Sequence, residues 1–158
     1  KLIVLFRNPV DRAYSNYHLG IRAGSENLSF EDAIQSELDS LKNSKIKSDD
    51  DVKKYTVPRS YIAKGFYADQ LKIWLKLFKS KQLFITSTED FESNANNTLN
   101  KIYDFLEIPQ INLKNLEKHK VASYPPMKDE TRKFLVDLYK IHNEELFRMI
   151  SKEFDWNK

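Results

Sequence analysis

The stretch at residues 1–17 constrains the fold of this chain more than any other. Residues 1–6 are apolar apart from Lys1 and rich in β-branched and aromatic types, which is typical of a strand buried on both faces of a parallel sheet. Arg7 follows this run. Asn8 is a helix-capping residue type, and Pro9 suits the first helical position because its missing N–H costs nothing there. The segment therefore predicts a strand, a tight turn and a helix.

Two residues of this stretch have side chains that can bind an anion. In open α/β sheets, ligands bind outside the carboxyl ends of strands, where Arg7 would stand. Ser15 would lie about 9 Å beyond Pro9 along the helix. A guanidinium supplies charge and forked donors, and a hydroxyl adds a neutral donor, so the pair could bind one phosphate. On spacing alone, a surface arginine and a tolerated helical serine are the simpler interpretation.

The pattern Arg7-Asn-Pro-x-x-Arg12-Ala-x-Ser15-x-Tyr17 resembles the 3′-phosphate-binding motif of sulfotransferases that use 3′-phosphoadenosine 5′-phosphosulfate (PAPS). In that family, the arginine at the strand end and the serine eight residues later bind the 3′-phosphate of the nucleotide. The resemblance implies this role for Arg7 and Ser15. It also implies a three-layer, P-loop-like α/β fold, helix-rich with a small parallel sheet, in one domain at residues 1–158.

Later segments resemble the family in the expected order. Residues 61–78 resemble a Gly-x-Tyr-x-x-x-Leu-x-x-Trp-Leu-x-x-Phe segment, with Tyr67, Leu71, Trp74, Leu75 and Phe78 on one apolar helical stripe. Residues 82–87 predict a second strand, followed by the carboxylates of Glu89 and Asp90, which we interpret as capping or local hydrogen-bonding groups. Residues 139–146 match a closing Tyr-x-x-x-Asn-x-x-Leu pattern.

The resemblance implies two further nucleotide contacts. Tyr67 lies where the helix of the family begins near the nucleotide, and is a candidate adenosine-side contact; the alternative is a buried tyrosine. Lys120 aligns with the lysine of a Lys-Gly-Arg-x-x-Pro loop that closes over the 3′-phosphate end in glycan-modifying members. Val121 and Ala122 stand where that loop has glycine and arginine. The alternative for Lys120 is a solvated loop cation.

Helical periodicity and capping residues predict most of the remaining structure. A helix should run from Pro9 to about residue 23, with Ala13, Tyr17 and Ile21 inward and Gly24 as its stop. Further helices are expected to follow Ser29 and to span residues 94–106 and 128–152. The polar composition of residues 41–57 predicts an exposed loop.

Composition excludes several other classes of protein. The 158 residues, 41% hydrophobic, suit one soluble globular domain, and no apolar run approaches the roughly 20 residues of a membrane span. The net charge of +3 is far from that of a nucleic-acid binder. There are no cysteines, and the three histidines lack metal-ligand spacing. Three consecutive carboxylates at residues 49–51 do not converge on one point, so we expect no metal.

The resemblance implies an enzyme that transfers a sulfuryl group from PAPS to a hydroxyl or amine of an acceptor. The match is to the glycan-directed and bacterial members, so we expect a carbohydrate acceptor, and a cytoplasmic location if the protein is bacterial. Family members carry a first strand and a phosphosulfate-binding loop upstream of the point where Lys1 stands, and no Gly-rich loop replaces it here. We therefore expect the parent protein to be the enzyme, and no catalytic residue is assigned.

Two alternatives remain at this point. The chain could be a non-catalytic remnant of the fold that binds an adenosine bisphosphate or a protein partner. A nucleotide kinase also carries an arginine at such a strand–helix junction, but the Gly-rich loop of that class is absent from this sequence.

Overall fold

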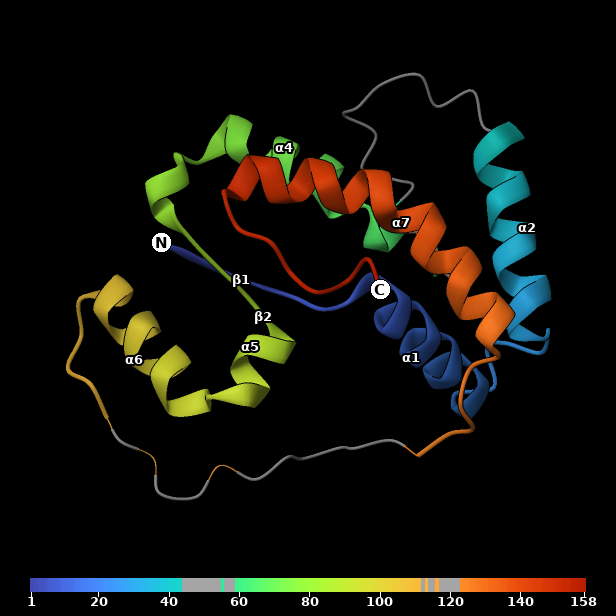
Figure 1. The fold of residues 1–158 in the computed structure, drawn as a ribbon, viewed down its shortest axis with the longest axis horizontal. Helices are drawn as coiled ribbons and strands as arrows, with labels where there is room; N and C mark the ends of the chain where they lie inside the picture. Colours follow the sequence, from blue (N-terminus) through green and yellow to red (C-terminus); the bar gives the residue numbers. More distant parts are fainter. Residues whose placement is uncertain (44–54, 56–58, 112, 114–115, 117–122) are drawn as a thin grey trace. The chain divides into compact units, whose positions relative to one another are not determined.

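The computed structural model describes residues 1–43, 55, 59–111, 113, 116 and 123–158 (Figure 1). They form two compact units. The first unit comprises Lys1–Asn8 and Leu77–Pro125, and the second comprises Pro9–Lys76 and Pro126–Lys158. Most of the loop expected at residues 41–57 lies outside the described residues.

The first unit contains a parallel pair of strands, β1 (Leu2–Phe6) and β2 (Leu83–Ser87), which lie side by side in Figure 1. Leu2 pairs with Leu83 and Phe6 with Ser87, so both predicted strands are confirmed. The prediction that the first strand is buried on both faces is wrong. Ile3 and Leu5 are 46% and 53% exposed, whereas Phe6 is buried. Successive side chains point to opposite faces of a sheet, and only one face of β1 is packed.

Polar caps start the two helices that follow β2. The hydroxyl of Ser87 accepts from the N–H of Asp90, at 3.0 Å, at the start of α5 (Thr88–Ser93). The side chain of Asn94 accepts from the N–H of Asn97, at 3.1 Å, at the start of α6 (Ala95–Leu106). A short 3-10 helix, η2 (Ser80–Gln82), precedes β2. The helix predicted at residues 94–106 is therefore confirmed, and it packs onto β2 through Phe105, whose ring lies 5.6 Å from that of Phe84.

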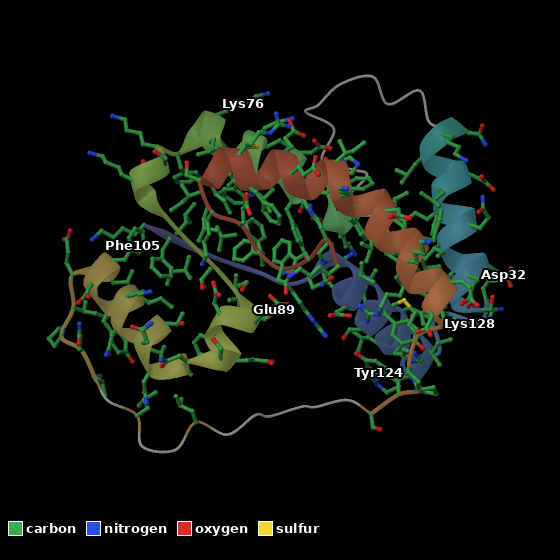
Figure 2. All side chains as sticks on the ribbon, in the orientation of Figure 1. Asp32, Lys76, Glu89, Phe105, Tyr124 and Lys128 are labelled. Atoms are coloured by element: carbon green, nitrogen blue, oxygen red, sulfur yellow. The ribbon has the colours of Figure 1, made fainter. Side chains whose placement is uncertain are left out.

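The second unit is helical. Its elements are α1 (Pro9–Arg22), α2 (Phe30–Asn43), the 3-10 helix η1 (Ala63–Gly65), α4 (Tyr67–Leu77) and α7 (Asp129–Ile150). Pro9 begins α1 as predicted, and Gly24 follows its end with a φ of +67°, a conformation that glycine adopts without strain. Ser29 caps α2 by accepting from the N–H of Asp32 at 3.1 Å. Figure 2 shows Asp32 at the start of α2.

The core of the second unit is formed where α1, α2, the residues just before η1, and α7 contribute apolar side chains. Its buried members include Val10, Ala13, Tyr17, Phe30, Ala33, Ile34, Ile62, Leu135 and Tyr139. The inward positions predicted for Ala13 and Tyr17 are confirmed. Ile21 is 39% exposed, so its predicted inward position is wrong. Trp74 and Leu75, on the predicted apolar stripe, are 49% and 36% exposed. The buried residues of α4 all fall between Tyr67 and Leu71, so its apolar stripe extends past the end of the packed surface.

The residues after α7 also belong to the second unit, and they pack back onto α7. Trp156 is 2% exposed, and its ring stacks on Phe154 at 4.3 Å and lies 5.7 Å from the ring of Phe147. The amide of Asn143 donates to the side-chain oxygen of Asn157 at 2.9 Å. None of the helices in the described part of the chain has the length and apolar character needed to cross a membrane.

Candidate functional site

Arg7 lies at the carboxyl edge of the sheet in the first unit, directly after β1. The backbone N–H of the next residue, Asn8, donates to Oε1 of Glu89 at 2.8 Å. Figure 2 shows Glu89 at the start of α5, which directly follows β2. The carboxylate of Glu89 thus ties together the segments that follow two neighbouring parallel strands. Our interpretation of Glu89 as a capping or local hydrogen-bonding group is wrong, because its partner lies 81 residues away in the sequence.

Ser15 lies on α1 in the second unit and is half-buried. Two contacts hold α1 in place about one turn before Ser15. Asp11 forms an ion pair with Arg132 of α7, with 2.6 Å between oxygen and nitrogen, and the guanidinium of Arg12 donates to the carbonyl of Tyr61. Arg7 and Ser15 belong to different units, so each is positioned by the packing of its own unit.

The backbone at residues 60–63 is held by a carboxylate that the sequence analysis did not single out. Glu37 of α2 accepts from the N–H groups of Tyr61, Ile62 and Ala63 at 2.6, 2.7 and 2.9 Å, and from the hydroxyl of Ser60 at 3.1 Å. One signal could have found it. Counting from Phe30, position 37 falls on the apolar face of the helix, where a carboxylate needs a buried partner.

Gly65 and Tyr67 flank the start of α4. A Cβ atom added at Gly65 would lie 2.7 Å from the ring of Tyr139, so the backbone approaches this ring closely. Tyr67 is 7% exposed, and its ring meets that of Trp156 edge-on at 6.0 Å. The structure thus shows the packing role of Tyr67, and its nucleotide contact stays a prediction. Lys120 lies outside the described residues.

With this geometry in place, comparison with known proteins gives the family. The model of the sulfotransferase domain family matches residues 1–158. This chain is a member of the sulfotransferase domain family. A sulfotransferase from Alicyclobacillus acidocaldarius has the same fold, with a TM-score of 0.77 over 100% of this chain and 57% of its own, at 23% identity. The α/β sulfotransferase fold is therefore confirmed.

Curated relatives of this sulfotransferase domain are longer proteins. Human carbohydrate sulfotransferase 15 is 27% identical over 173 residues, which is 99% of this chain and 31% of the relative. A bovine bifunctional heparan sulfate N-deacetylase/N-sulfotransferase 2 is 27% identical across 96% of this chain and 19% of its own length. The membrane-associated sulfotransferase kil1 of Dictyostelium discoideum is 32% identical over 95 residues, 60% of this chain and 20% of the relative. The chain spans a third or less of each.

Buried hydrogen bonds fix the charge states around residue 61 of the sulfotransferase domain. The hydroxyl of Tyr61 donates to Oε2 of Glu26 at 2.8 Å. Burial, and then this carboxylate, raise the pKa of Tyr61 well above its usual value. Burial by itself would raise the pKa of Glu26. Hydrogen bonds from the N–H of Leu28, the Tyr61 hydroxyl and the N–H of Asn27, with the charge of Arg59, outweigh it and lower that pKa. Tyr61 therefore stays a neutral donor and Glu26 a charged acceptor.

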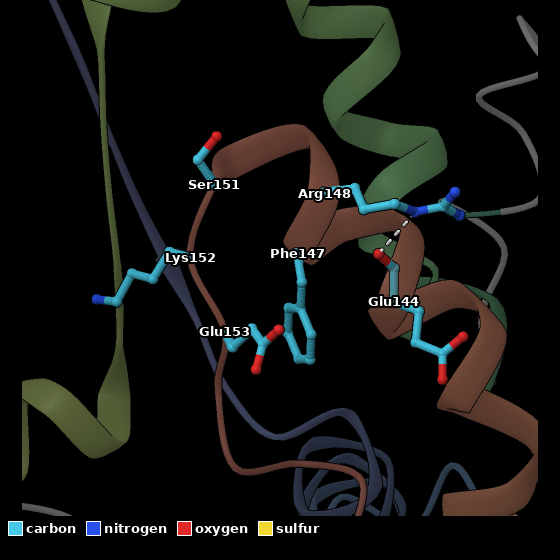
Figure 3. Close-up of a pocket in the computed structure, with 6 residues that line it drawn as sticks. All are labelled: Glu144, Phe147, Arg148, Ser151, Lys152 and Glu153. Carbon is cyan, nitrogen blue, oxygen red and sulfur yellow. Dashed lines mark hydrogen bonds between the residues drawn. The ribbon is translucent and has the colours of Figure 1, made fainter.

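A cavity of about 620 Å³ lies at the C-terminal end of α7 (Figure 3). Its lining residues are Glu144, Phe147, Arg148, Ser151, Lys152 and Glu153. The side chain of Arg148 donates to the backbone carbonyl of Glu144 at 3.3 Å. Two carboxylates balance two cations here, so the lining has no net charge to attract a nucleotide with two phosphate groups. We do not assign the nucleotide to this cavity.

Proposed function

We propose that this sulfotransferase domain binds PAPS with its 3′-phosphate at Arg7 and Ser15. The observation that carries the proposal is the junction in which β1 ends at Phe6 and α1 begins at Pro9, with Arg7 between them. Anionic ligands of open α/β sheets bind at such strand ends. Membership of the sulfotransferase family adds support, because the junction carries the resemblance to the 3′-phosphate motif.

The two residues would make different contributions to the 3′-phosphate. The guanidinium of Arg7 can donate two parallel hydrogen bonds to phosphate oxygens and neutralise part of their charge. The hydroxyl of Ser15 can add one directional hydrogen bond without a second charge. We assign Tyr67 to the adenosine side and the ammonium of Lys120 to the phosphate end, both from the resemblance alone. A nucleotide without the 3′-phosphate should then bind much more weakly.

We propose that the protein transfers the sulfuryl group of PAPS to a hydroxyl or amine of a carbohydrate. The sulfur–oxygen bond to the donor phosphate breaks, a bond from sulfur to the acceptor oxygen or nitrogen forms, and the acceptor loses its proton. Adenosine 3′,5′-bisphosphate is the other product. By fixing the far end of the donor, Arg7 and Ser15 would set the position of the reacting sulfur, and orientation of this kind contributes strongly to catalysis.

The names of two relatives support a glycan acceptor, since one is called a carbohydrate sulfotransferase and the other acts on heparan sulfate. The test is transfer of labelled sulfate from PAPS to an unsulfated glycosaminoglycan, with a simple phenol as the competing acceptor. We expect the label on the polysaccharide. Label on the phenol alone would contradict the glycan acceptor, and nucleotide binding without transfer to either would favour the non-catalytic alternative.

Calorimetric titration with adenosine 3′,5′-bisphosphate tests the nucleotide site directly. Arg7→Ala should weaken binding by about tenfold or more, because it removes a charge-assisted contact. Arg22→Ala is the matched control, since Arg22 is an exposed arginine at the other end of α1. Equal loss of affinity in both variants would show that only net charge matters, and would contradict the assignment of Arg7.

A further inference from the structure

We propose that Arg12, Glu37 and Tyr139 are positioning residues that clamp residues 60–65 against α1 and so fix the place of Ser15. This inference rests on the proposed function, because it gives Ser15 a ligand to bind. All of these residues belong to the second unit. We call residues 60–65 the bridge segment.

Three N–H groups of the bridge segment face one carboxylate. Glu37 of α2 accepts from three consecutive backbone N–H groups, at residues 61–63, within 2.9 Å. Hydrogen bonds to a charged acceptor are strong and directional. Truncating Glu37 would remove this acceptor from all three N–H groups, of which that of Tyr61 has the carbonyl of Arg59, at 3.1 Å, as a second partner. The donor side of the bridge segment is therefore fixed to α2.

The carbonyl groups of the same peptides face α1 and α7. Arg12 of α1 donates to the carbonyl of Tyr61, and the hydroxyl of Tyr139 of α7 donates to the carbonyl of Ile62 at 2.9 Å. Tyr139 is completely buried, and burial raises the pKa of its hydroxyl well above the usual value, so it remains a donor. A carboxylate on the donor side and a guanidinium on the acceptor side polarise the intervening peptides in the same sense, which strengthens both sets of bonds.

The bridge segment has little room to shift. Gly65, at its end, lies so close to the ring of Tyr139 that an added Cβ would be 2.7 Å from it. The ring of Tyr61 lies 5.9 Å from that of Tyr17 on α1. Contacts on both sides and along its length thus make the bridge segment a rigid support.

α1 is fixed to this support on the side that carries Ser15. Residues three and four apart share one face of a helix, so Asp11, Arg12 and Ser15 lie on the same side of α1. Asp11 pairs with Arg132, and Arg12 donates a hydrogen bond to the bridge segment. These two contacts fix the rotation of α1 about its axis and its position along that axis at Ser15. The guanidinium of Arg12 is engaged by backbone, so we assign this second arginine of the motif to positioning and not to the phosphate.

The test uses the ratio of two dissociation constants, that for 5′-AMP divided by that for adenosine 3′,5′-bisphosphate. This ratio isolates the 3′-phosphate, and a loss of folded protein does not change it. Tyr139→Phe removes only the hydroxyl that holds the bridge segment. Tyr17→Phe is the matched control, because it removes a hydroxyl that also donates to a backbone carbonyl at 2.9 Å, that of Leu28, in the same unit.

We expect Tyr139→Phe to lower the ratio by about fivefold and Tyr17→Phe to change it by less than about twofold. In a Ser15→Ala background, Tyr139→Phe should have almost no further effect, because the hydroxyl that it positions is gone. A fivefold effect that persists in that background would overturn the positioning role, as would an unchanged ratio in Tyr139→Phe.

A failure of the proposed function would give a different result from a failure of the clamp. If the wild-type ratio were close to one, the 3′-phosphate site itself would be wrong, and this inference would fall with it. If the wild-type ratio is high and Arg7→Ala lowers it, but Tyr139→Phe does not, only the clamp is overturned.

Discussion

Different interactions stabilise the interiors of the two units of this sulfotransferase domain. In the first unit, the buried described residues are Phe6, Thr86, Ser87 and Thr98, three of them polar, and the apolar side chains of α6 are half-buried. In the second unit, Val10, Ile62, Leu135, Tyr139 and Leu146 are fully buried. The first unit therefore depends on a strand ladder and helix caps, and the second on a packed core crossed by charged hydrogen bonds. Substitutions should act on the two units very differently.

Among substitutions of polar side chains, removing the carboxylate of Glu37 should have the largest effect on stability. Glu37→Ala removes an acceptor from three backbone N–H groups, of which that of Tyr61 keeps the carbonyl of Arg59 at 3.1 Å, and we expect the free energy of unfolding to fall by about 3 kcal/mol. Urea denaturation followed by circular dichroism measures it. Asp39→Ala is the control on the same helix, where an exposed bond from Gln35 should be worth less than about 0.5 kcal/mol. Equal losses would show that the second unit does not depend on the half-buried carboxylate of Glu37.

Gly65→Ala should have the next largest effect on the free energy of unfolding. The new methyl group would meet the buried ring of Tyr139, and overpacking of this kind typically costs about 1–3 kcal/mol. In a Tyr139→Ala background, the same substitution should cost less than about 0.5 kcal/mol, because the ring is gone. Thermal unfolding of the four proteins measures this coupling. A cost for Gly65→Ala that does not depend on residue 139 would mean that the close approach is not what requires glycine.

Acid should weaken the second unit through Glu26. Its pKa is lower in the folded protein than the ordinary value of 4.5, so its stabilising contribution is complete above that pH and is lost as the pH falls toward the folded pKa. Glu26→Gln should therefore flatten the fall of unfolding free energy below pH 4.5. Glu107 of the first unit is the comparison. Its hydrogen bond and ion pair with Lys1 lower its pKa, but its side chain is 81% exposed.

Glu107→Gln should leave the pH dependence almost unchanged, because exposed ion pairs are screened by solvent. Urea melts at several pH values between 3 and 6, values chosen to span roughly the range of carboxyl titration, give both results. A larger change in Glu107→Gln than in Glu26→Gln would reverse the contrast between the two units.

The smallest effect is expected on the open face of β1. Leu5 is 53% exposed, so Leu5→Thr should change the free energy of unfolding by no more than about 0.5 kcal/mol. Leu135→Ala in the second unit, where the side chain is fully buried, should cost about 2–5 kcal/mol. Urea denaturation of the two variants measures both changes in the free energy of unfolding. A loss above 2 kcal/mol for Leu5→Thr, roughly the lower limit for a core truncation, would show that this face of the strand is packed in solution.

Local signals in the sequence predicted most of the secondary structure. Pro9 and Gly24 marked the ends of α1, Ser29 marked the start of α2, and both strands fell within one residue of the prediction. These signals work because capping and φ preferences act between neighbouring residues. The sequence was a poorer guide to which apolar side chains are buried. The apolar stripe of α4 includes Trp74, but how far a stripe is covered depends on the elements that pack against it.

The candidate site was predictable only where a motif marks it. The family pattern indicated Arg7 and Ser15, and the strand–helix junction that carries Arg7 is present. The bonds between Glu37 and residues 61–63 join positions at least 24 residues apart, and the contact of Gly65 with Tyr139 joins residues on different helices. No periodicity encodes such partners, because they depend on how the chain folds back on itself.

The central claim is that Arg7 recognises the 3′-phosphate, and replacing it by lysine tests this most directly. Lysine keeps the charge but lacks the planar fork of donors. We measure by calorimetry the ratio of the dissociation constants for 5′-AMP and adenosine 3′,5′-bisphosphate. The account predicts a high ratio in the wild-type protein, a reduced one in Arg7→Lys and a lower one still in Arg7→Ala. A high ratio that survives both substitutions would contradict the claim.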